Sequence, residues 1–171
     1  GRDEQAQRAR PLTLTALRAL YQEQLERSPQ ADITLVLGLT GLRWGELAGL
    51  RVGDVMIGTS VAGETTMTLD VSRTVIYDHG GGKASLKPYP KGRRRRSVPV
   101  ANAAVQLVLA RMEGKGADEP LFAAPGGGLL SESNWRRAVG WTTSVGHRPH
   151  DLRHTAASLF RSSRQRPSTG T

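Results

Sequence analysis

The chain has 171 residues, and 24 basic against 15 acidic side chains give it a net charge of +9. Its lysines are Lys83, Lys87, Lys91 and Lys115, so arginine carries most of the positive charge. The lack of cysteine excludes disulfide scaffolds, thiolate zinc sites, iron–sulfur clusters and thiol nucleophiles. No apolar run reaches the roughly 20 residues of a membrane-spanning helix, and no signal-peptide pattern opens the sequence. We therefore expect one soluble, cytoplasmic domain with an anionic partner. Nucleic acid is the first candidate, because guanidinium groups pair with phosphate oxygens two at a time.

A polar arm and a helix open the chain. Residues 1–11 are rich in charged and polar side chains, which is typical of a linker or arm. From Leu14 onwards apolar residues recur at helical spacing, and Thr13 is a candidate N-cap. Ser28, which is followed by proline, predicts the start of a second helix.

A buried helix and a short helical segment come next. Residues 33–39 are apolar on nearly all sides, which predicts a helix inside the core. Gly41 is its predicted stop, because glycine readily takes the left-handed conformation that ends helices. A short helical segment is predicted over 44–50.

The middle of the chain changes to a strand pattern. Apolar and polar residues alternate over 67–71, and 74–77 is rich in residues that favour strands. Three glycines at 80–82 predict a flexible connection, and 97–100 predicts a returning strand. Further amphipathic helices are predicted over 105–112, after Ser131 and after Pro149. The predicted fold is therefore mostly α-helical with a small antiparallel β-sheet, an α+β class.

Three groups of residues could carry chemistry, and the first follows the buried helix. In the run 40–47, Arg43 comes directly after the helix stop, so it starts beside the core while its head is free to reach a ligand. Glu46 lies on the same face if the helix continues, close enough to orient the guanidinium of Arg43. An ordinary ion pair on a helix surface is the alternative interpretation.

The second group is the basic run 87–96. At the turn of a β-hairpin such a run could enter a DNA groove or lie along the phosphates. A disordered basic loop or a localisation-type patch is the alternative. Lys91 differs from the arginines around it, because a lysine with a lowered pKa donates a proton to a leaving alkoxide far more readily.

The third group is the run 149–154. On a helix, His150 and Arg153 share one face. A side chain that could act as an acid or base and a guanidinium that could bind a phosphate would then point to the same side. His150 and His154 have the spacing of helical metal ligands, but Arg153 lies between them and no third ligand is evident. A polar helix face with a satisfied histidine is the alternative.

Taken in order, these groups resemble the catalytic domain of the tyrosine recombinases, the phage integrase family. The resemblance rests on Thr-Gly-Leu-Arg-Trp-Gly-Glu-Leu at 40–47, on Lys91 in a hairpin ahead of Pro99, and on His-Asp-Leu-Arg-His at 150–154. It covers residues 12–160 and implies a mostly helical fold with a small three-stranded antiparallel sheet. It also implies binding of duplex DNA without a metal or nucleotide cofactor.

The resemblance further implies the roles of individual residues. Arg43 and Arg153 would bracket the scissile phosphate and stabilise the charge of its pentacoordinate transition state. Lys91 would protonate the leaving 5′-oxygen, with Lys87 as the alternative because the basic run leaves the hairpin register open. His150 would donate to the phosphate and accept a proton from the nucleophile.

Supporting and DNA-contacting residues follow from the same resemblance. Glu46 would position Arg43, and His154 would support the last helix. The expected DNA contacts come from the basic run, namely Lys87, Arg93, Arg94, Arg95 and Arg96.

The end of the chain departs from the family. The family continues past its second arginine to a Leu-Gly-His segment and then to the tyrosine that attacks DNA. Residues 161–171 are polar and without periodicity here, which we interpret as a disordered basic tail after a domain that lacks its C-terminal helices. The tyrosines, at positions 21, 77 and 89, all precede Arg153. We therefore expect no nucleophile and no strand cleavage by this chain alone.

The resulting hypothesis is a DNA-binding fragment of a phage-type integrase, derived from a prophage, that retains its phosphate site. One alternative is a recombinase subunit whose tyrosine comes in trans from a full-length partner, and another is a non-functional remnant. Whether the chain is an enzyme stays open between them. Double-stranded DNA is the expected partner, full-length recombinase subunits are a further candidate, and the nucleoid is the expected location of the DNA-bound form.

Overall fold

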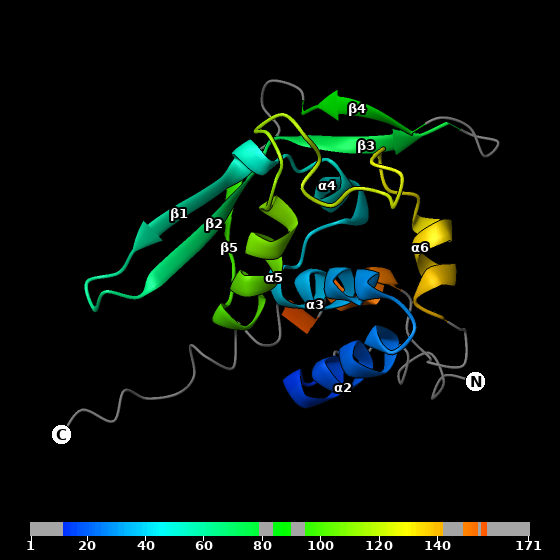
Figure 1. Ribbon diagram of the computed structural model, residues 1–171, viewed down its shortest axis with the longest axis horizontal. Coiled ribbons are helices and arrows are strands. Elements are labelled where there is room, and N and C mark those ends of the chain that lie inside the picture. Colours follow the sequence, from blue (N-terminus) through cyan, green and yellow to red (C-terminus); the bar gives the residue numbers. More distant parts are fainter. Residues whose placement is uncertain (1–11, 79–83, 90–94, 142–148, 154, 157–171) are drawn as a thin grey trace, which may run out of the picture. The chain divides into compact units, whose positions relative to one another are not determined.

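The computed structural model describes residues 12–78, 84–89, 95–141, 149–153 and 155–156 (Figure 1). The chain divides into two compact units, one formed by residues 1–41 and 138–171 and the other by residues 42–137. We call them the first and the second unit and describe each by itself.

The first unit opens with helix α2 (Leu14–Leu25), which forms at the predicted place. The hydroxyl of Thr13 accepts a hydrogen bond from the backbone N–H of Ala16 at 3.1 Å and so satisfies one free donor of the first turn. Leu17 and Leu20 are buried on the inner face of the helix. The predicted N-cap is thereby confirmed. Of the apolar residues expected at helical spacing, Leu17 is buried, whereas Leu25 is 40% exposed.

The 3-10 helix η1 (Pro29–Ala31) and helix α3 (Asp32–Thr40) follow. The hydroxyl of Ser28 caps η1, as predicted, by accepting from the N–H of Gln30 at 3.2 Å. Residues 32–38 are buried throughout, in agreement with the predicted core helix. Gly41 ends α3 with a φ of +72°, the left-handed conformation that glycine adopts without steric cost.

The C-terminal part of the first unit contributes the 3-10 helix η4 (Pro149–Asp151) and the helical residues after it. Leu152 and Thr155 are buried there, and the hydroxyl of Thr155 accepts from the backbone N–H of Leu12 at 3.2 Å. This bond ties the residues ahead of α2 to the segment after η4. The predicted helix after Pro149 thus starts as a 3-10 turn, and the part of it beyond residue 156 lies outside the described residues.

The second unit contains the strands. Its elements in chain order are α4 (Trp44–Ala48), η2 (Val52–Asp54), β1 (Val55–Thr59), β2 (Thr65–Val71), β3 (Arg73–Tyr77), β4 (Ala84–Pro88), β5 (Arg96–Pro99), α5 (Asn102–Met112) and nearly all of α6 (Glu132–Ala138). β1, β2 and β5 form an antiparallel sheet in the order β1-β2-β5, and β3 and β4 form a separate antiparallel pair. The predicted class, mostly helical with a small antiparallel sheet, is confirmed. Strands β1 and β4 were not predicted.

The register of the strand pairs shows that residues are inserted between β4 and β5. Only Ser72 separates β2 from β3, whereas residues 89–95 separate β4 from β5. Val71 pairs with Arg96 and Arg73 pairs with Pro88, so the segment 89–95 is inserted opposite a single residue. Most of the basic run, including Lys91, belongs to this insertion.

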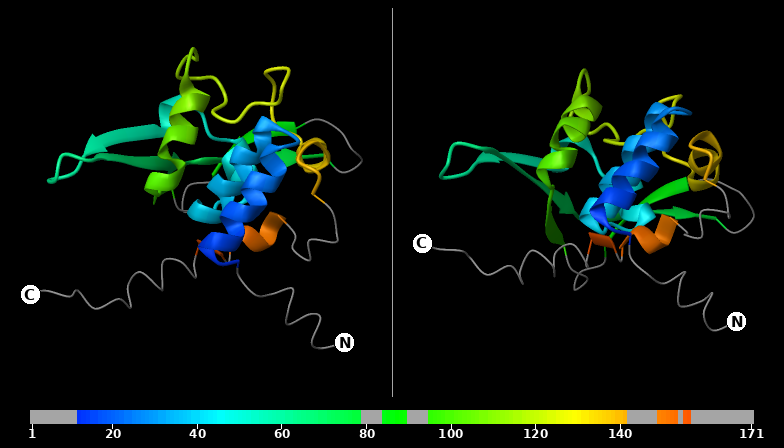
Figure 2. Two further views of the ribbon diagram at one scale, coloured as in Figure 1. Left: turned by 60° about the horizontal axis from the view of Figure 1, so that its bottom comes forward. Right: turned by 90° about the horizontal axis from the view of Figure 1, so that it is seen from below.

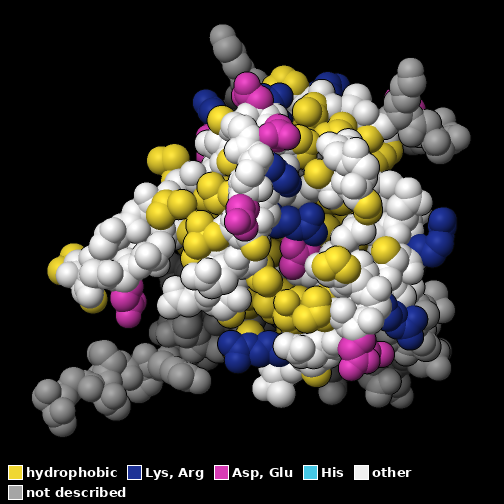
Figure 3. Space-filling view, viewed as in Figure 1, with side chains coloured by type: hydrophobic (Ala, Val, Ile, Leu, Met, Phe, Trp, Pro, Cys, Tyr) yellow, Lys and Arg dark blue, Asp and Glu magenta, His cyan; other side chains and the backbone are white. Residues whose placement is uncertain are grey.

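The β1–β2 hairpin extends from the rest of the second unit (Figures 1 and 2). Apolar side chains lie at its surface (Figure 3), where Met56 and Ile57 are 61% and 54% exposed and Val61 is fully exposed. The core of the unit is formed by other residues, among them Leu47, Leu69, Val98 and Phe122. None of the described helices has the length and apolar character needed to cross a membrane.

Helix α4 packs against β3 through a glycine. A Cβ atom at Gly45 would lie 2.5 Å from Oγ1 of Thr74 and 2.8 Å from the carbonyl oxygen of Val75. The backbone oxygen cannot rotate away as a flexible side chain could. The close approach of α4 to β3 therefore requires glycine at this position.

Gly45→Ala is expected to lower the free energy of unfolding by about 1–3 kcal/mol, the usual cost of forcing a methyl group into filled space. Urea denaturation followed by circular dichroism measures this difference. Gly126→Ala is the matched control, because a Cβ there would meet nothing within 4 Å, and its change should stay within about 0.5 kcal/mol. Equal losses in the two variants would contradict the packing argument.

Candidate functional site

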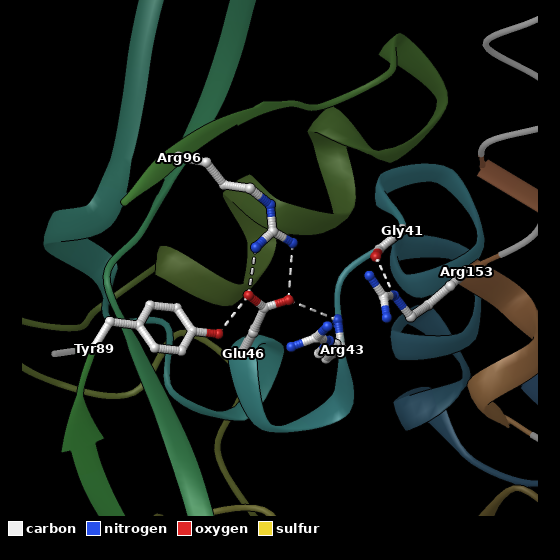
Figure 4. A network of polar contacts seen from close by, with 6 residues as sticks. All are labelled: Gly41, Arg43, Glu46, Tyr89, Arg96 and Arg153. Carbon is white, nitrogen blue, oxygen red and sulfur yellow. Dashed lines mark hydrogen bonds and ion pairs between the residues drawn. The ribbon is translucent and has the colours of Figure 1, made fainter. Parts of the chain in front are cut away.

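The carboxylate of Glu46 is the centre of a polar cluster in the second unit (Figure 4). Its side chain is 1% exposed and forms a two-pronged ion pair with the guanidinium of Arg96, at 2.5 Å and 2.8 Å. The hydroxyl of Tyr89 donates to Oε2 at 2.6 Å, and the backbone N–H of Arg43 donates to Oε1 at 3.0 Å. Each carboxylate oxygen therefore accepts two hydrogen bonds, which compensates for the burial of the charge.

Three elements bring these side chains together. Arg43 has an extended backbone (φ −70°, ψ 152°) and stands at the N-cap position of α4, so Glu46 reaches back to its N–H from the first turn of the helix. Tyr89 follows β4 directly and donates its own N–H to the carbonyl of Ser72 at 3.1 Å. Arg96 is the first residue of β5. The cluster thus joins the start of α4 to both ends of the insertion.

The far end of α4 is fixed by a second ion pair. Arg73 on β3 pairs with the carboxylate of Asp54 and donates to the carbonyl of Gly49 at 3.2 Å. Asp54 also accepts from the N–H of Arg51 at 2.8 Å. Both ends of this short helix are therefore held by hydrogen-bonded charges.

The environment of Glu46 stabilises its ionised form. Burial by itself raises the pKa of a carboxyl group, but the hydrogen bonds from Arg96, Tyr89 and the Arg43 N–H outweigh it and lower the pKa of Glu46 to about 2. The carboxylate is therefore charged at every physiological pH and stays available to its donors.

The same contacts act on the hydroxyl of Tyr89. Burial, and then the hydrogen bond to Glu46 and the charge of that carboxylate, raise the pKa of the Tyr89 hydroxyl, while the charges of Arg96 and Arg43 act in the opposite direction. A phenol with a raised pKa is less readily converted to the phenolate that attacks phosphorus. Its proton is also already donated to a carboxylate.

The structure changes the interpretation of Glu46 and Arg43. We expected the carboxylate to orient the guanidinium of Arg43, yet the two residues are joined through the backbone N–H of Arg43. The guanidinium that Glu46 holds belongs to Arg96. Arg43 itself is exposed.

Arg153 and His150 belong to the first unit. The Nε of Arg153 donates to the carbonyl of Gly41 at 2.9 Å (Figure 4), and Gly41 precedes Arg43 by two positions in the chain. A Cβ at Gly41 would lie 3.2 Å from the Cβ of Ala156, so the helix stop packs closely against the helical residues that carry Arg153. His150 lies in η4 with an exposed side chain.

The basic run divides into residues with different surroundings. Lys87 is exposed on β4 opposite Thr74. Arg95 is 74% exposed and lies 3.5 Å from the carboxylate of Asp70, whereas Arg96 is engaged with Glu46. The predicted site residues Lys91, Arg93, Arg94 and His154 lie outside the described residues.

Tyr89 is the residue whose role the sequence did not reveal. The sequence indicates only that it precedes Arg153 and so does not match the nucleophile of the family, and its partner Glu46 is 43 positions away in the chain. No spacing rule connects residues so far apart. Over the described ranges, no three histidine, aspartate or glutamate side chains gather closely enough to hold a metal ion.

The fold is similar to solved structures of recombinases and integrases. The integrase of transposon Tn1549 with circular intermediate DNA matches with a TM-score of 0.67 at 17% sequence identity, over 91% of this chain and 55% of that chain. A variant of the same integrase with transposon right end DNA gives a TM-score of 0.59 at 20% identity, over 92% and 55%. XerA recombinase gives 0.58 at 21% identity, over 90% and 50%.

These similarities show that the chain has the fold of tyrosine-recombinase catalytic domains, and that it spans about half the length of the proteins it matches. No protein-family model matches the sequence, and no curated protein matches it significantly.

Proposed function

We propose that this chain is a duplex-DNA-binding module of a site-specific recombinase of the phage integrase type. The observation that carries the proposal is the exposed Arg43 at the N-cap of α4. The buried Glu46 fixes the backbone of Arg43 through its N–H, and both residues belong to the motif 40–47 that resembles the family. The recombinase fold and the Tn1549 integrase structures that contain DNA support it.

In this proposal each cationic side chain has a role at one phosphodiester of the DNA, and the roles in strand cleavage are exercised only when another subunit supplies the nucleophile. Arg43 and Arg153 donate to its non-bridging oxygens and stabilise the extra negative charge of the five-coordinate transition state. Lys91, with Lys87 as the alternative, gives a proton to the leaving 5′-oxygen. His150 donates to the phosphate and takes the proton of an attacking hydroxyl. His154 supports the helix that carries Arg153.

We further propose that none of the tyrosines in this sequence is the nucleophile. The hydroxyl of Tyr77 donates to the carbonyl of Leu130 at 2.7 Å, and the hydroxyl of Tyr89 donates to Glu46. Tyr21 lies half-buried on α2, where burial and the charge of Asp32 raise its pKa. This chain alone therefore binds DNA without cutting it.

A nicked suicide substrate, which traps a covalent protein–DNA intermediate, tests this assignment. The chain alone is expected to yield no adduct on denaturing gels, although it shifts the same DNA on native gels. An adduct formed by the chain alone and abolished by Tyr89→Phe would show that the nucleophile is present after all. Absence of the native-gel shift would overturn the DNA-binding proposal itself.

The alternative of a tyrosine supplied in trans predicts a different result in the same assay. An added recombinase that has its tyrosine but lacks its own arginines would form an adduct only with this chain present, and Arg43→Gln would abolish it. The remnant alternative predicts that the chain does not fold, and a cooperative thermal melt would contradict it.

A further inference from the structure

Glu46 connects parts of the chain that are far apart in sequence. Arg43, which starts α4, donates its N–H to Oε1, and Arg96, which starts β5, places its guanidinium on both oxygens. Tyr89, directly after β4, donates its hydroxyl to Oε2. One buried carboxylate therefore contacts the backbone of Arg43, the residue after β4 and the first residue of β5.

The contacts of Arg96 and Tyr89 assign them to this carboxylate and not to DNA. The Nη1 and Nη2 atoms of Arg96 meet Glu46 in the two-pronged geometry, so this edge of the guanidinium is occupied by the carboxylate. A phosphate at that edge would have to displace a carboxylate that is 1% exposed, and the carboxylate would stay buried after losing its ion-pair partner. Arg95, at 74% exposure, is free of this constraint.

We propose that Tyr89 and Arg96 are positioning residues: by holding Glu46 they fix the backbone of Arg43. This inference rests on the proposed function, because Arg43 is there assigned to the phosphate. Arg96 accordingly leaves the group of expected DNA contacts, which keeps Lys87, Arg93, Arg94 and Arg95.

The first test is independent of DNA and measures amide hydrogen exchange in the free protein by NMR. Tyr89→Phe and Arg96→Gln should each speed exchange at the Arg43 N–H roughly five- to tenfold, the effect of losing about one hydrogen bond. The N–H of Gly49, which donates to Gly45 within α4 at 3.0 Å, should keep its rate. Tyr21→Phe, a change of the same kind in the first unit, should leave Arg43 unaffected. Unchanged exchange at Arg43 in both test variants would overturn the proposal.

The second test compares Arg96→Gln with Arg95→Gln, which remove the same charge from adjacent positions. If Arg96 acts through Glu46 on Arg43, Arg96→Gln should weaken duplex binding about tenfold more than Arg95→Gln. In an Arg43→Gln background this excess should disappear, because the residue being positioned is gone. Arg96→Lys, which keeps the charge and one hydrogen bond, should restore part of the affinity.

Two outcomes of the second test would overturn the positioning role. One is equal loss for the two variants in the parent chain, and the other is an excess that persists in the Arg43→Gln background. If the parent chain binds no DNA, the proposed function fails, and the exchange measurement still decides whether Tyr89 and Arg96 hold Arg43 through Glu46.

Discussion

Replacing Arg93, Arg94 and Arg95 together with glutamine is expected to weaken duplex DNA binding by about 10²-fold or more near 0.1 M salt. Each phosphate contact releases counterions and adds roughly 0.9 to the slope of log K against log salt concentration, so losing three contacts flattens the slope by about 2–3. Fluorescence anisotropy titrations between about 50 and 200 mM salt measure both quantities. Arg96 is left in place because it belongs to the Glu46 cluster.

A charge-matched control separates location from net charge. Replacing Arg18, Arg136 and Arg137 with glutamine also removes three positive charges, in this case from helices α2 and α6. This control should keep most of the affinity and the salt slope of the parent chain, because these arginines are not part of the basic run that is expected to contact the phosphates. Equal losses in both triple variants would mean that the basic run is not the contact element and that the +9 charge acts only as a whole.

The helical part of the fold could be predicted because its signals are local. Thr13 and Ser28 bond backbone groups two or three positions away, and Gly41 ends its helix by its own backbone conformation. A pattern that involves only nearest neighbours is visible in the sequence whatever the rest of the chain does. Such signals also explain why the buried helix 32–40 was found almost to the residue.

Strands β1 and β4 could not be predicted because they bury little. In each of them the first residue is half-buried and the remaining four are exposed, so no alternation of apolar and polar residues marks the strand. Both are held by the backbone ladder that β2 and β3 provide. Strand formation of this kind depends on a partner and not on the strand's own pattern.

The residues of the candidate site also differ in whether the sequence could reveal their contacts. Glu46 was identified because it stands three positions after Arg43 in a short motif, and that local relation appears in the structure as a backbone hydrogen bond. Arg96 is 50 positions from Glu46, so residue type alone grouped it with the arginines beside it. A run of like charges does not indicate which of its residues contacts a buried carboxylate, because the strand register determines which residue is placed there.

Acidification is expected to destabilise the protein through Glu46. The pKa of this carboxyl is lowered from an ordinary 4.5 to about 2 in the folded chain, with burial opposed and outweighed by the bonds from Arg96, Tyr89 and Arg43. Its stabilisation is therefore fully present above about pH 5 and is lost as the pH falls towards 2. A pKa shift of this size contributes on the order of 3 kcal/mol to the free energy of unfolding.

Urea denaturation between pH 6 and pH 2.5, on the parent chain and on Glu46→Gln, isolates this contribution from that of the other carboxyl groups. At neutral pH the variant should be less stable by about 2–3 kcal/mol, because an amide cannot pair with the Arg96 guanidinium as an anion does. The gap should close as the pH falls, because protonated Glu46 resembles the amide. Glu64→Gln, at an exposed position, should run parallel to the parent chain throughout. A gap between the parent chain and Glu46→Gln that stays constant from pH 6 to 2.5 would mean that Glu46 is not held as a carboxylate by its three donors.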